Sequence, residues 1–258
     1  MNSFSFGKNW ISFVKNIEKN TFDQSLSSFD DILGIIKINK GNFLDIGSGS
    51  GLFSLAAKKR GFNVSSFDVD INSVKATQKI KNFYYQDDEK WEIFRGNILD
   101  NNFLEKKFKK KFDFVYSWGV LHHTGNMYKA IENAASLVNK KGFFVISIYN
   151  DQGVFSNYWK IVKKLYNKNS FFKLFSILFH SPYFLFFIPL YKFLKKDPFD
   201  KRGMVIWNNY LDWIGGYPFE VASPLEIESF FTKLKFHLIH KNLVGKKLGC
   251  NEFIFRKN

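Results

Sequence analysis

The amino-acid sequence predicts an α/β fold: a doubly wound, seven-stranded, mostly parallel sheet that carries an inserted helical lid. Three observations lead to this prediction. Apolar segments alternate with helical segments over residues 42–149, a glycine-rich loop follows the first apolar segment, and a basic, aromatic stretch at 152–218 interrupts the alternation. Apolar strands that alternate with helices are typical of a mostly parallel sheet covered on both faces.

Each element is expected where the local composition changes. The expected strands are short runs rich in apolar residues, at 42–46, 63–67, 91–94, 112–116, 142–149, 236–243 and 252–256. The expected helices lie between them, at 52–60, 71–81, 126–138 and 224–233. Asp70 directly precedes the second helix and is expected to cap its N-terminus.

We expect residues 1–258 to form a single domain, because this length is within the range of one large core. Its parts are an N-terminal helical segment at 1–40, a core at 41–150 and 220–258, and the inserted lid at 151–219. No internal repeat is visible.

Composition narrows the classes of protein. The hydrophobic fraction of 45% fits an ordinary globular chain. A single cysteine, Cys250, excludes a disulfide framework and a cysteine-rich zinc site, and it fits a reducing cytoplasm. The first residues contain no continuous apolar run of the secretory type, so we expect no signal peptide. The net charge of +15 is mild evidence for an anionic partner.

The interrupting stretch has an unusual composition. No Asp or Glu occurs from Gln152 to Lys196, while lysines stand among aromatic residues. Its apolar run is broken by Lys173, His180 and prolines, so it is not expected to span a membrane. Two compatible interpretations remain: helices that pack on the core as a lid, and a surface that contacts a membrane or admits a lipophilic substrate.

The glycine-rich loop has the form D-x-G-x-G-x-G, from Asp45 to Gly51. Three glycines at alternate positions predict a tight loop beneath a bound molecule. The spacing departs from the G-x-G-x-x-G dinucleotide fingerprint, because Leu52 stands at the third glycine position. No Gly-Lys-Ser/Thr follows, so the loop is not a P-loop.

This loop resembles motif I of the class I S-adenosylmethionine-dependent methyltransferases, which have a Rossmann-like fold. The resemblance implies S-adenosyl-L-methionine as cofactor, with Asp45 near its ammonium group, Asp68 at the ribose, Asn97 and Ile98 at the adenine, and Ser117 and Trp118 beside it. The full set of expected cofactor-binding residues is Asp45, Gly47, Ser48, Gly49, Gly51, Asp68, Val69, Asn97, Ile98, Ser117 and Trp118.

The segment from Gly119 to Thr124 resembles the E-V-L-E-H segment of the quinone-biosynthesis O-methyltransferases. His123 matches the family's histidine, whereas Gly119 and His122 replace two acids that the family links to metal or substrate handling. This replacement argues against a direct quinone assignment. His123 is expected to be a general base for an acceptor hydroxyl, and the alternative is polar packing of both histidines. No metal site is expected, because no cluster at ligand spacing is present.

Segments along essentially the whole chain are similar to one bacterial group described as similar to polyprenyl-hydroxybenzoquinol methylases. The similar segments are FGKNW at 6–10, YNDQG at 149–153, RGM at 202–204, DWIGGYPFE at 212–220 and LGCNEF at 248–253. From their positions, the expected acceptor-binding residues are Trp10, Tyr149, Asn150, Arg202, Asp212 and Trp213. The alternative is that Asp212 and Trp213 only fasten the lid.

The sequence therefore predicts a methyltransferase acting on a small molecule, by O-methylation of a lipophilic or aromatic acceptor. Its location is expected to be cytoplasmic, with peripheral membrane contact through the lid. An RNA methyltransferase is an alternative, but no RNA-binding module is visible and a nucleic-acid partner is not expected. A non-catalytic cofactor-binding protein is a second alternative. The acceptor, the methylated atom and the oligomeric state stay open.

Overall fold

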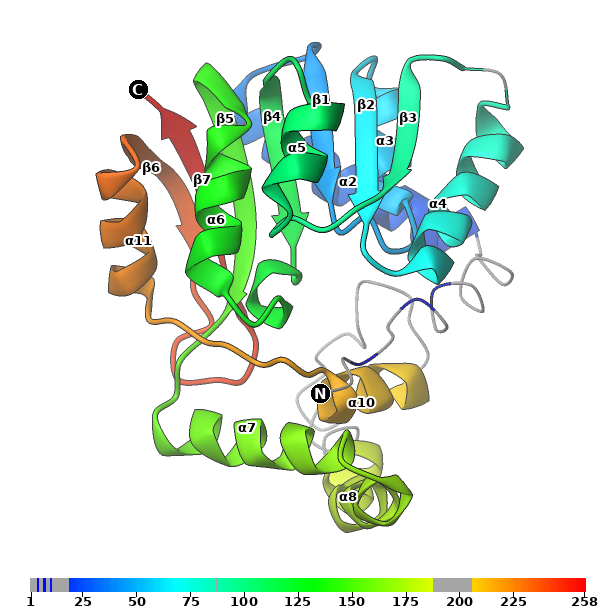
Figure 1. The fold of residues 1–258 in the computed structure, drawn as a ribbon, viewed down its shortest axis with the longest axis vertical. Coiled ribbons are helices and arrows are strands. Elements are labelled where there is room, and N and C mark those ends of the chain that lie inside the picture. The colour runs from blue at the N-terminus through cyan, green and yellow to red at the C-terminus, as the bar shows by residue number, and fades with distance from the viewer. Residues whose placement is uncertain (1–3, 5–6, 8–9, 11–18, 87, 188–205) are drawn as a thin grey trace.

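The structure is a computed structural model that describes residues 4, 7, 10, 19–86, 88–187 and 206–258. It contains the predicted seven-stranded sheet, in the order β3-β2-β1-β4-β5-β7-β6 (Figure 1). The strands are β1 (Asn42–Ile46), β2 (Asn63–Asp68), β3 (Trp91–Arg95), β4 (Phe112–Trp118), β5 (Val138–Tyr149), β6 (Phe236–Asn242) and β7 (Cys250–Lys257). The first five strands pair in parallel, and β7 pairs antiparallel with both β5 and β6.

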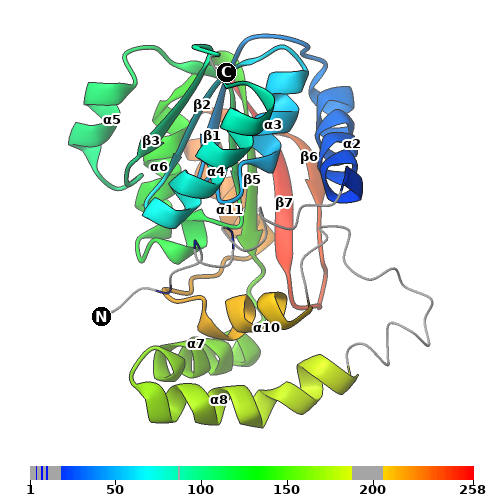
Figure 2. The same ribbon diagram turned by 90° about the vertical axis from the view of Figure 1, so that its right-hand side faces the viewer.

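Helices cover both faces of this sheet, which confirms the predicted doubly wound fold. One face carries α2 (Lys19–Ile36), α3 (Leu52–Lys59) and α4 (Ile71–Tyr84), and the other carries α5 (Asn101–Lys107), α6 (Met127–Ser136) and α11 (Pro224–Lys233) (Figure 2). Each face has its own apolar core, because successive side chains of a strand point to opposite faces. On β5, Phe143 and Val145 belong to the α2 side, whereas Phe144 and Ile146 belong to the α6 side.

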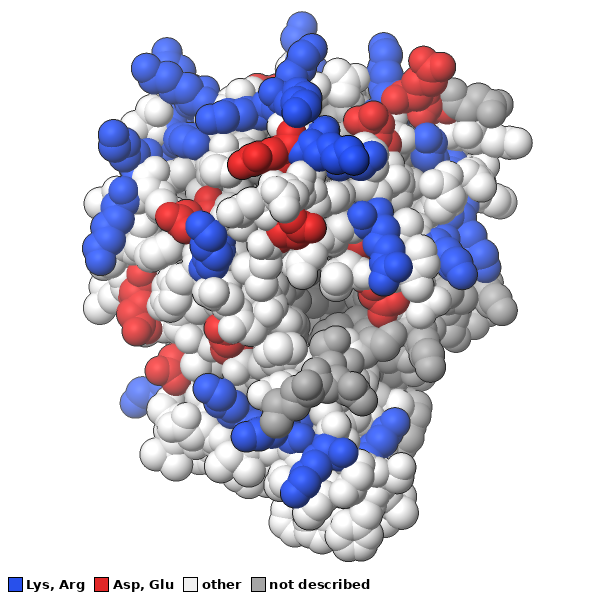
Figure 3. All heavy atoms as spheres, viewed as in Figure 1, with Lys and Arg blue, Asp and Glu red and all other residues white. Residues whose placement is uncertain are grey.

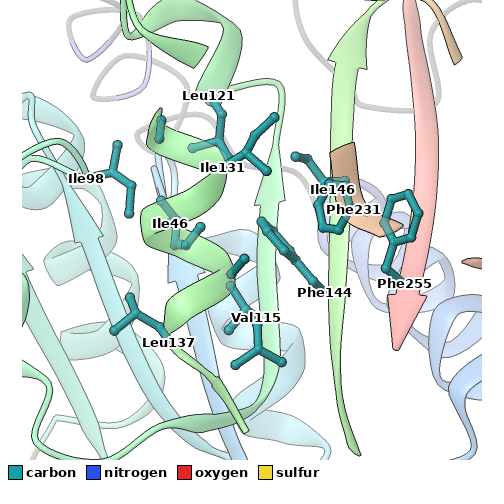
Figure 4. Close-up of a cluster of buried hydrophobic side chains, with 14 of the residues drawn as sticks. Ile46, Ile98, Val115, Leu121, Ile131, Leu137, Phe144, Ile146, Phe231 and Phe255 are labelled. Carbon is teal, nitrogen blue, oxygen red and sulfur yellow. The ribbon is translucent and has the colours of Figure 1, made fainter. Parts of the chain in front are cut away.

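The α6 side of the core is closed by aromatic packing. Phe231 of α11 stacks on Phe255 of β7 with ring centroids 3.9 Å apart, next to Phe144 of β5 (Figure 4). Both Phe231 and Phe144 are fully buried. Burying one such side chain contributes roughly 1.5–3 kcal/mol, so this cluster holds α11 and the closing strand β7 on the sheet.

Local signals account for most helix boundaries. The Asp70 carboxylate accepts a hydrogen bond from the Asn72 N–H at 2.8 Å, which confirms the predicted N-cap of α4. Ser223 and Glu226 form a capping box at the start of α11. Several boundaries differ from the sequence prediction by one to four residues; the helix expected to end at residue 138 ends at Ser136, and the strand expected to begin at residue 142 begins earlier. Val138 instead begins β5, because it pairs with Phe112 at the start of β4.

The inserted segment lies beyond the carboxyl ends of the parallel strands (Figure 1). It contains α7 (Val154–Tyr166), α8 (Ser170–Pro182), the π-helical turn η2 (Tyr183–Phe187) and α10 (Ile206–Gly215). A third apolar cluster joins α7 to α10 through Trp159, Tyr210 and Phe219. None of the helices within the described residues combines the length and apolar character needed to cross a membrane.

The two ends of this insertion are held together by backbone hydrogen bonds. The Asp151 N–H donates to the Ala222 carbonyl at 3.2 Å, and the Ala222 N–H donates to the Tyr149 carbonyl at 3.1 Å. Asn150 and Ala222 also form an isolated parallel bridge. The chain therefore leaves the sheet and returns to it at one point.

Candidate active site

The glycine loop after β1 adopts a backbone conformation that other residues rarely adopt. Gly47, Gly49 and Gly51 have φ angles of +75°, +54° and +85°. At Gly47 a Cβ atom would lie 2.5 Å from two Val120 methyl carbons, and at Gly51 it would lie 2.9 Å from the Thr77 Cα. The alternate glycines thus allow both the left-handed backbone turn and the close approach of Val120 and Thr77.

A cavity of about 1030 Å³ opens beside this loop. Its walls come from the loops that follow β1, β2, β3 and β4, from α2, and from β6 and β7. The carboxyl ends of the strands in an open α/β sheet are where ligands bind. The cavity therefore lies where the sequence predicts a bound cofactor.

Asp45 lies at the base of the cavity and is only 3% exposed. One of its carboxylate oxygens accepts a hydrogen bond from the Ser54 hydroxyl at 2.5 Å, and Ser54 also contacts the Ser66 hydroxyl. Burial raises the pKa of Asp45 to about 7, partly offset by the Ser54 hydrogen bond and increased by the nearby Asp68 carboxylate. A cation bound in the cavity would stabilise the ionised form of this carboxyl.

Asp68 ends β2 and holds the glycine loop. Its two oxygens accept the Gly49 N–H at 3.1 Å and the Asp70 N–H at 2.9 Å. Burial raises its pKa to about 6, against the effect of these backbone hydrogen bonds. The carboxylate lines the cavity and keeps acceptor positions beyond the two backbone donors.

The residues after β3 and β4 complete the predicted cofactor wall. Asn97 and Ile98 line the cavity, and the Asn97 side chain accepts the Leu99 N–H at 2.9 Å. Trp118 also lines it and stacks on Tyr116, with ring centroids 5.8 Å apart. Of the predicted cofactor-binding residues, those that line the cavity are Asp45, Gly47, Ser48, Gly49, Asp68, Val69, Asn97, Ile98 and Trp118.

Two predicted cofactor residues have packing roles. Gly51 is the N-cap of α3 and lies against Thr77 of α4. Ser117 is fully buried, and its hydroxyl donates to the Ile46 carbonyl at 3.2 Å. Neither residue lines the cavity.

His123 lines the cavity and has a defined tautomer. Its Nδ1 lies 2.6 Å from the Pro218 carbonyl oxygen, which can only accept, so Nδ1 carries the proton and Nε2 the lone pair. Burial lowers its pKa to about 3, despite the Pro218 hydrogen bond that favours the protonated ring. His123 is therefore neutral at neutral pH.

His122 faces away from the cavity lining and is fully buried. Its Nδ1 accepts the Tyr149 N–H at 3.3 Å, and burial holds its pKa well below the usual value. Among the described residues its Nε2 has no hydrogen-bond partner. His122 thus takes part in packing, which was the alternative interpretation.

The predicted acceptor-binding residues are not brought together. Trp10 lines the cavity beside Gly49, but Tyr149, Asn150, Asp212 and Trp213 do not. Asn150 binds the Gly245 carbonyl and Asn251, and Tyr149 packs on Trp213 with ring centroids 5.4 Å apart. Arg202 lies outside the described residues.

A buried lysine holds the half-buried Trp213 against the apolar cluster of the inserted segment. Lys163 of α7 is fully buried, donates to the Trp213 carbonyl, and lies over the rings of Trp213 and Phe219. Burial lowers the pKa of Lys163 to about 7, although Asp212 favours its charged form. These contacts fasten α7 to the end of α10 and to Phe219 in the turn that follows it.

Several residues that line the cavity are not predicted by the sequence. Tyr217 and Pro218 reach the cavity from the turn after α10, and Ser25, Ser28 and Asp31 reach it from α2. The D-W-I-G-G-Y-P segment at 212–218 is a signal for the turn, because glycine and proline shape a backbone. The α2 residues carry no comparable local signal. No group of three or more potential metal ligands occurs within the described part of the chain.

Comparisons with known proteins agree with this geometry. A family model described as methyltransferase domain matches residues 20–177, which is more than half of the chain. Ubiquinone biosynthesis O-methyltransferases from Rickettsia akari and Rickettsia typhi are 26% and 27% identical over 113 residues. The matched part is 44% of this chain and 42% and 43% of those proteins, so the chain spans less than half the length of these relatives.

Solved structures share the fold. A putative S-adenosyl-L-methionine-dependent methyltransferase from Methanococcus maripaludis matches with a TM-score of 0.55 at 14% identity, covering 100% of this chain and 96% of that one. Magnesium protoporphyrin IX methyltransferase from Synechocystis with bound SAM matches with a TM-score of 0.54 at 10% identity, covering 92% and 81%. The chain belongs to the methyltransferase domain family, which confirms the predicted class of protein.

Proposed function

We propose that the protein transfers a methyl group from S-adenosyl-L-methionine to a small-molecule acceptor, at an oxygen atom of a lipophilic or aromatic compound. One observation carries the cofactor assignment: the buried Asp45 and the half-buried Asp68, two carboxyl groups at the ends of adjacent strands, line one cavity beside the glycine loop. A cofactor with an ammonium group and two ribose hydroxyls fits these acceptors.

The residues of the cavity fit this cofactor in three further respects. The glycine loop leads into the N-terminus of α3, where N–H groups favour a carboxylate. Asp68 has acceptor capacity for ribose hydroxyls, and Asn97 and Ile98 follow β3 at the position expected for adenine. Trp118 and Phe53 supply flat apolar walls to the same cavity.

The chain has little covalent chemistry to perform. Held by Asp45, Asp68 and the glycine loop, the cofactor would supply an already activated methyl group for transfer to the acceptor oxygen. The cavity walls orient the acceptor and exclude water, which are the main contributions of a protein to such a transfer. We assign His123 the removal of the acceptor proton, because its neutral ring lines the cavity. A weak base suffices, since an oxygen that gains a methyl group becomes strongly acidic.

A lipophilic acceptor and a cytoplasmic location are parts of the same proposal. The lipophilic acceptor is supported by the aromatic walls of the cavity and by the partial identity to ubiquinone O-methyltransferases. The single, half-buried Cys250 supports a reducing compartment.

The test is binding followed by transfer. Calorimetry should detect binding of S-adenosylmethionine and S-adenosylhomocysteine. With methyl-labelled cofactor and a cell extract, label should enter the organic-soluble fraction and His123→Asn should reduce it without weakening cofactor binding. Label recovered only in RNA would replace this proposal by the nucleic-acid alternative, and an absence of cofactor binding would refute it.

A further inference from the structure

Helix α8 buries two polar side chains and leaves most of its apolar side chains exposed. Its buried side chains are Ser176 and His180, which face the rest of the insertion. The His180 Nδ1 donates to the Ser176 carbonyl oxygen at 2.7 Å, and its Nε2 is hydrogen-bonded to the Tyr158 hydroxyl at 2.6 Å. A helix that packs only on its own protein normally buries its apolar stripe, so the outer face of α8 requires another explanation.

The outer face of α8 is a continuous apolar stripe. Its side chains recur every three or four residues and are between 57% and 72% exposed: Phe171, Leu174, Phe175, Leu178 and Phe179. Tyr183 and Phe186 continue the exposed apolar surface through η2. We call these seven residues the α8 stripe. Monomeric proteins rarely expose so large a connected apolar surface without a binding role.

The surroundings of the α8 stripe are basic. Lys160 and Lys164 of α7, Lys168 of the connecting turn and Lys173 of α8 are exposed. No Asp or Glu occurs between Gln152 and Lys196, and the ion pairs found among the described residues all lie elsewhere. Figure 3 shows lysines gathered over α7 and an uncharged end of the molecule below them, where α8 lies.

We propose that the α8 stripe docks the protein on an anionic lipid surface. Apolar side chains that enter the interface and lysines that attract anionic headgroups are the two components of such binding. A second copy of the chain fits less well, because a symmetric contact through the stripe would bring the same lysines of both copies together. Thirteen residues are too few to cross a bilayer, so α8 lies along the surface.

Docking in this way has a consequence for the cavity. The insertion and the cavity are both at the carboxyl ends of the parallel strands (Figure 1). The membrane would therefore face the end of the molecule at which a lipophilic acceptor enters. This consequence rests on the proposed function, whereas docking itself does not.

The experiment is flotation of the full chain with vesicles of phosphatidylcholine, alone or mixed with phosphatidylglycerol. We expect binding to the mixed vesicles that weakens as salt rises. The Phe175→Ser/Phe179→Ser variant removes two stacked, exposed rings and should bind at least about tenfold more weakly. Phe83→Ser is the matched control, because Phe83 is 80% exposed on α4, and it should bind as the unaltered chain does.

The outcomes are separable. Equal binding to neutral and mixed vesicles, no binding to either, or full binding by the double variant would each overturn the proposal. If sedimentation showed that the unaltered chain is a dimer and that the double variant is a monomer, the α8 stripe would bind a second copy of the chain. That result would also overturn the proposal. Calorimetry with S-adenosylhomocysteine on the same samples tests the proposed function separately, since the cofactor residues lie outside α8.

Discussion

Replacing Asp68 by alanine is expected to weaken S-adenosylhomocysteine binding by roughly 1–3 kcal/mol, about 5- to 150-fold. The Asp68 carboxylate already accepts the Gly49 and Asp70 N–H groups, so cofactor hydroxyls would use its remaining acceptor positions. A hydrogen bond to a charged group contributes roughly 1.5–3 kcal/mol. Part of this binding free energy is retained in the variant, because water can occupy the place of the Asp68 carboxylate and bind the Gly49 and Asp70 N–H groups.

The measurement is calorimetric titration at about pH 8, where a group with a pKa of about 6 is ionised. The matched control is Asp100→Ala, which removes the N-cap of α5 and lies outside the cavity lining. It should lower the free energy of unfolding by about 1 kcal/mol without changing the affinity. A folded Asp68→Ala protein with unaltered affinity would refute the assignment of Asp68 to the cofactor.

Three further predictions concern charge, metal and the insertion. Burial raises the pKa of Asp45 from 3.8 to about 7, so the folded state holds this proton longer than the unfolded state. The free energy of unfolding should fall by up to about 4 kcal/mol as pH rises from about 4 to about 7. Asp45→Asn should flatten that decline in urea titrations, and an unchanged pH profile would contradict the pKa. Chelation should leave methyl transfer intact, whereas activity restored only by a divalent ion would show a metal requirement. Deleting α8 should abolish transfer but preserve cofactor binding; loss of both, with a core shown to be folded by circular dichroism, would give the insertion a role in the cofactor site.

The sheet was predictable because its signals are local. Apolar runs such as NFLDI at 42–46 and GFFVISIY at 142–149 are short and rich in apolar and aromatic residues, which favours buried strands over helices. Asp70 and Ser223 mark helix starts through hydrogen bonds that span two or three residues. Helix α5 was not predicted, because its seven residues, NNFLEKK, are too few to show a helical period.

The cofactor side of the candidate site was predictable from the sequence because its signals are local, whereas the acceptor side was not. The cofactor side follows from the loops at the ends of consecutive strands, so a short motif places Asp45, Gly49 and Asp68 together. The acceptor side depends on contacts between distant segments. His123 is oriented by Pro218, and Trp213 is drawn into the lid by Lys163. No local pattern shows that a lysine at 163 is buried, since such side chains are usually exposed.

The two ends of the insertion are hydrogen-bonded to each other, so the insertion can vary without changing the sheet. Backbone hydrogen bonds join Tyr149 and Asp151 to Ala222. The chain therefore returns to the sheet at the point where it left it, whatever lies between these residues. Changes in the length or sequence of these helices need not disturb the strand register or the glycine loop. Selection can therefore alter which acceptor is admitted, or which surface the protein visits, while the machinery for the methyl donor is inherited unchanged.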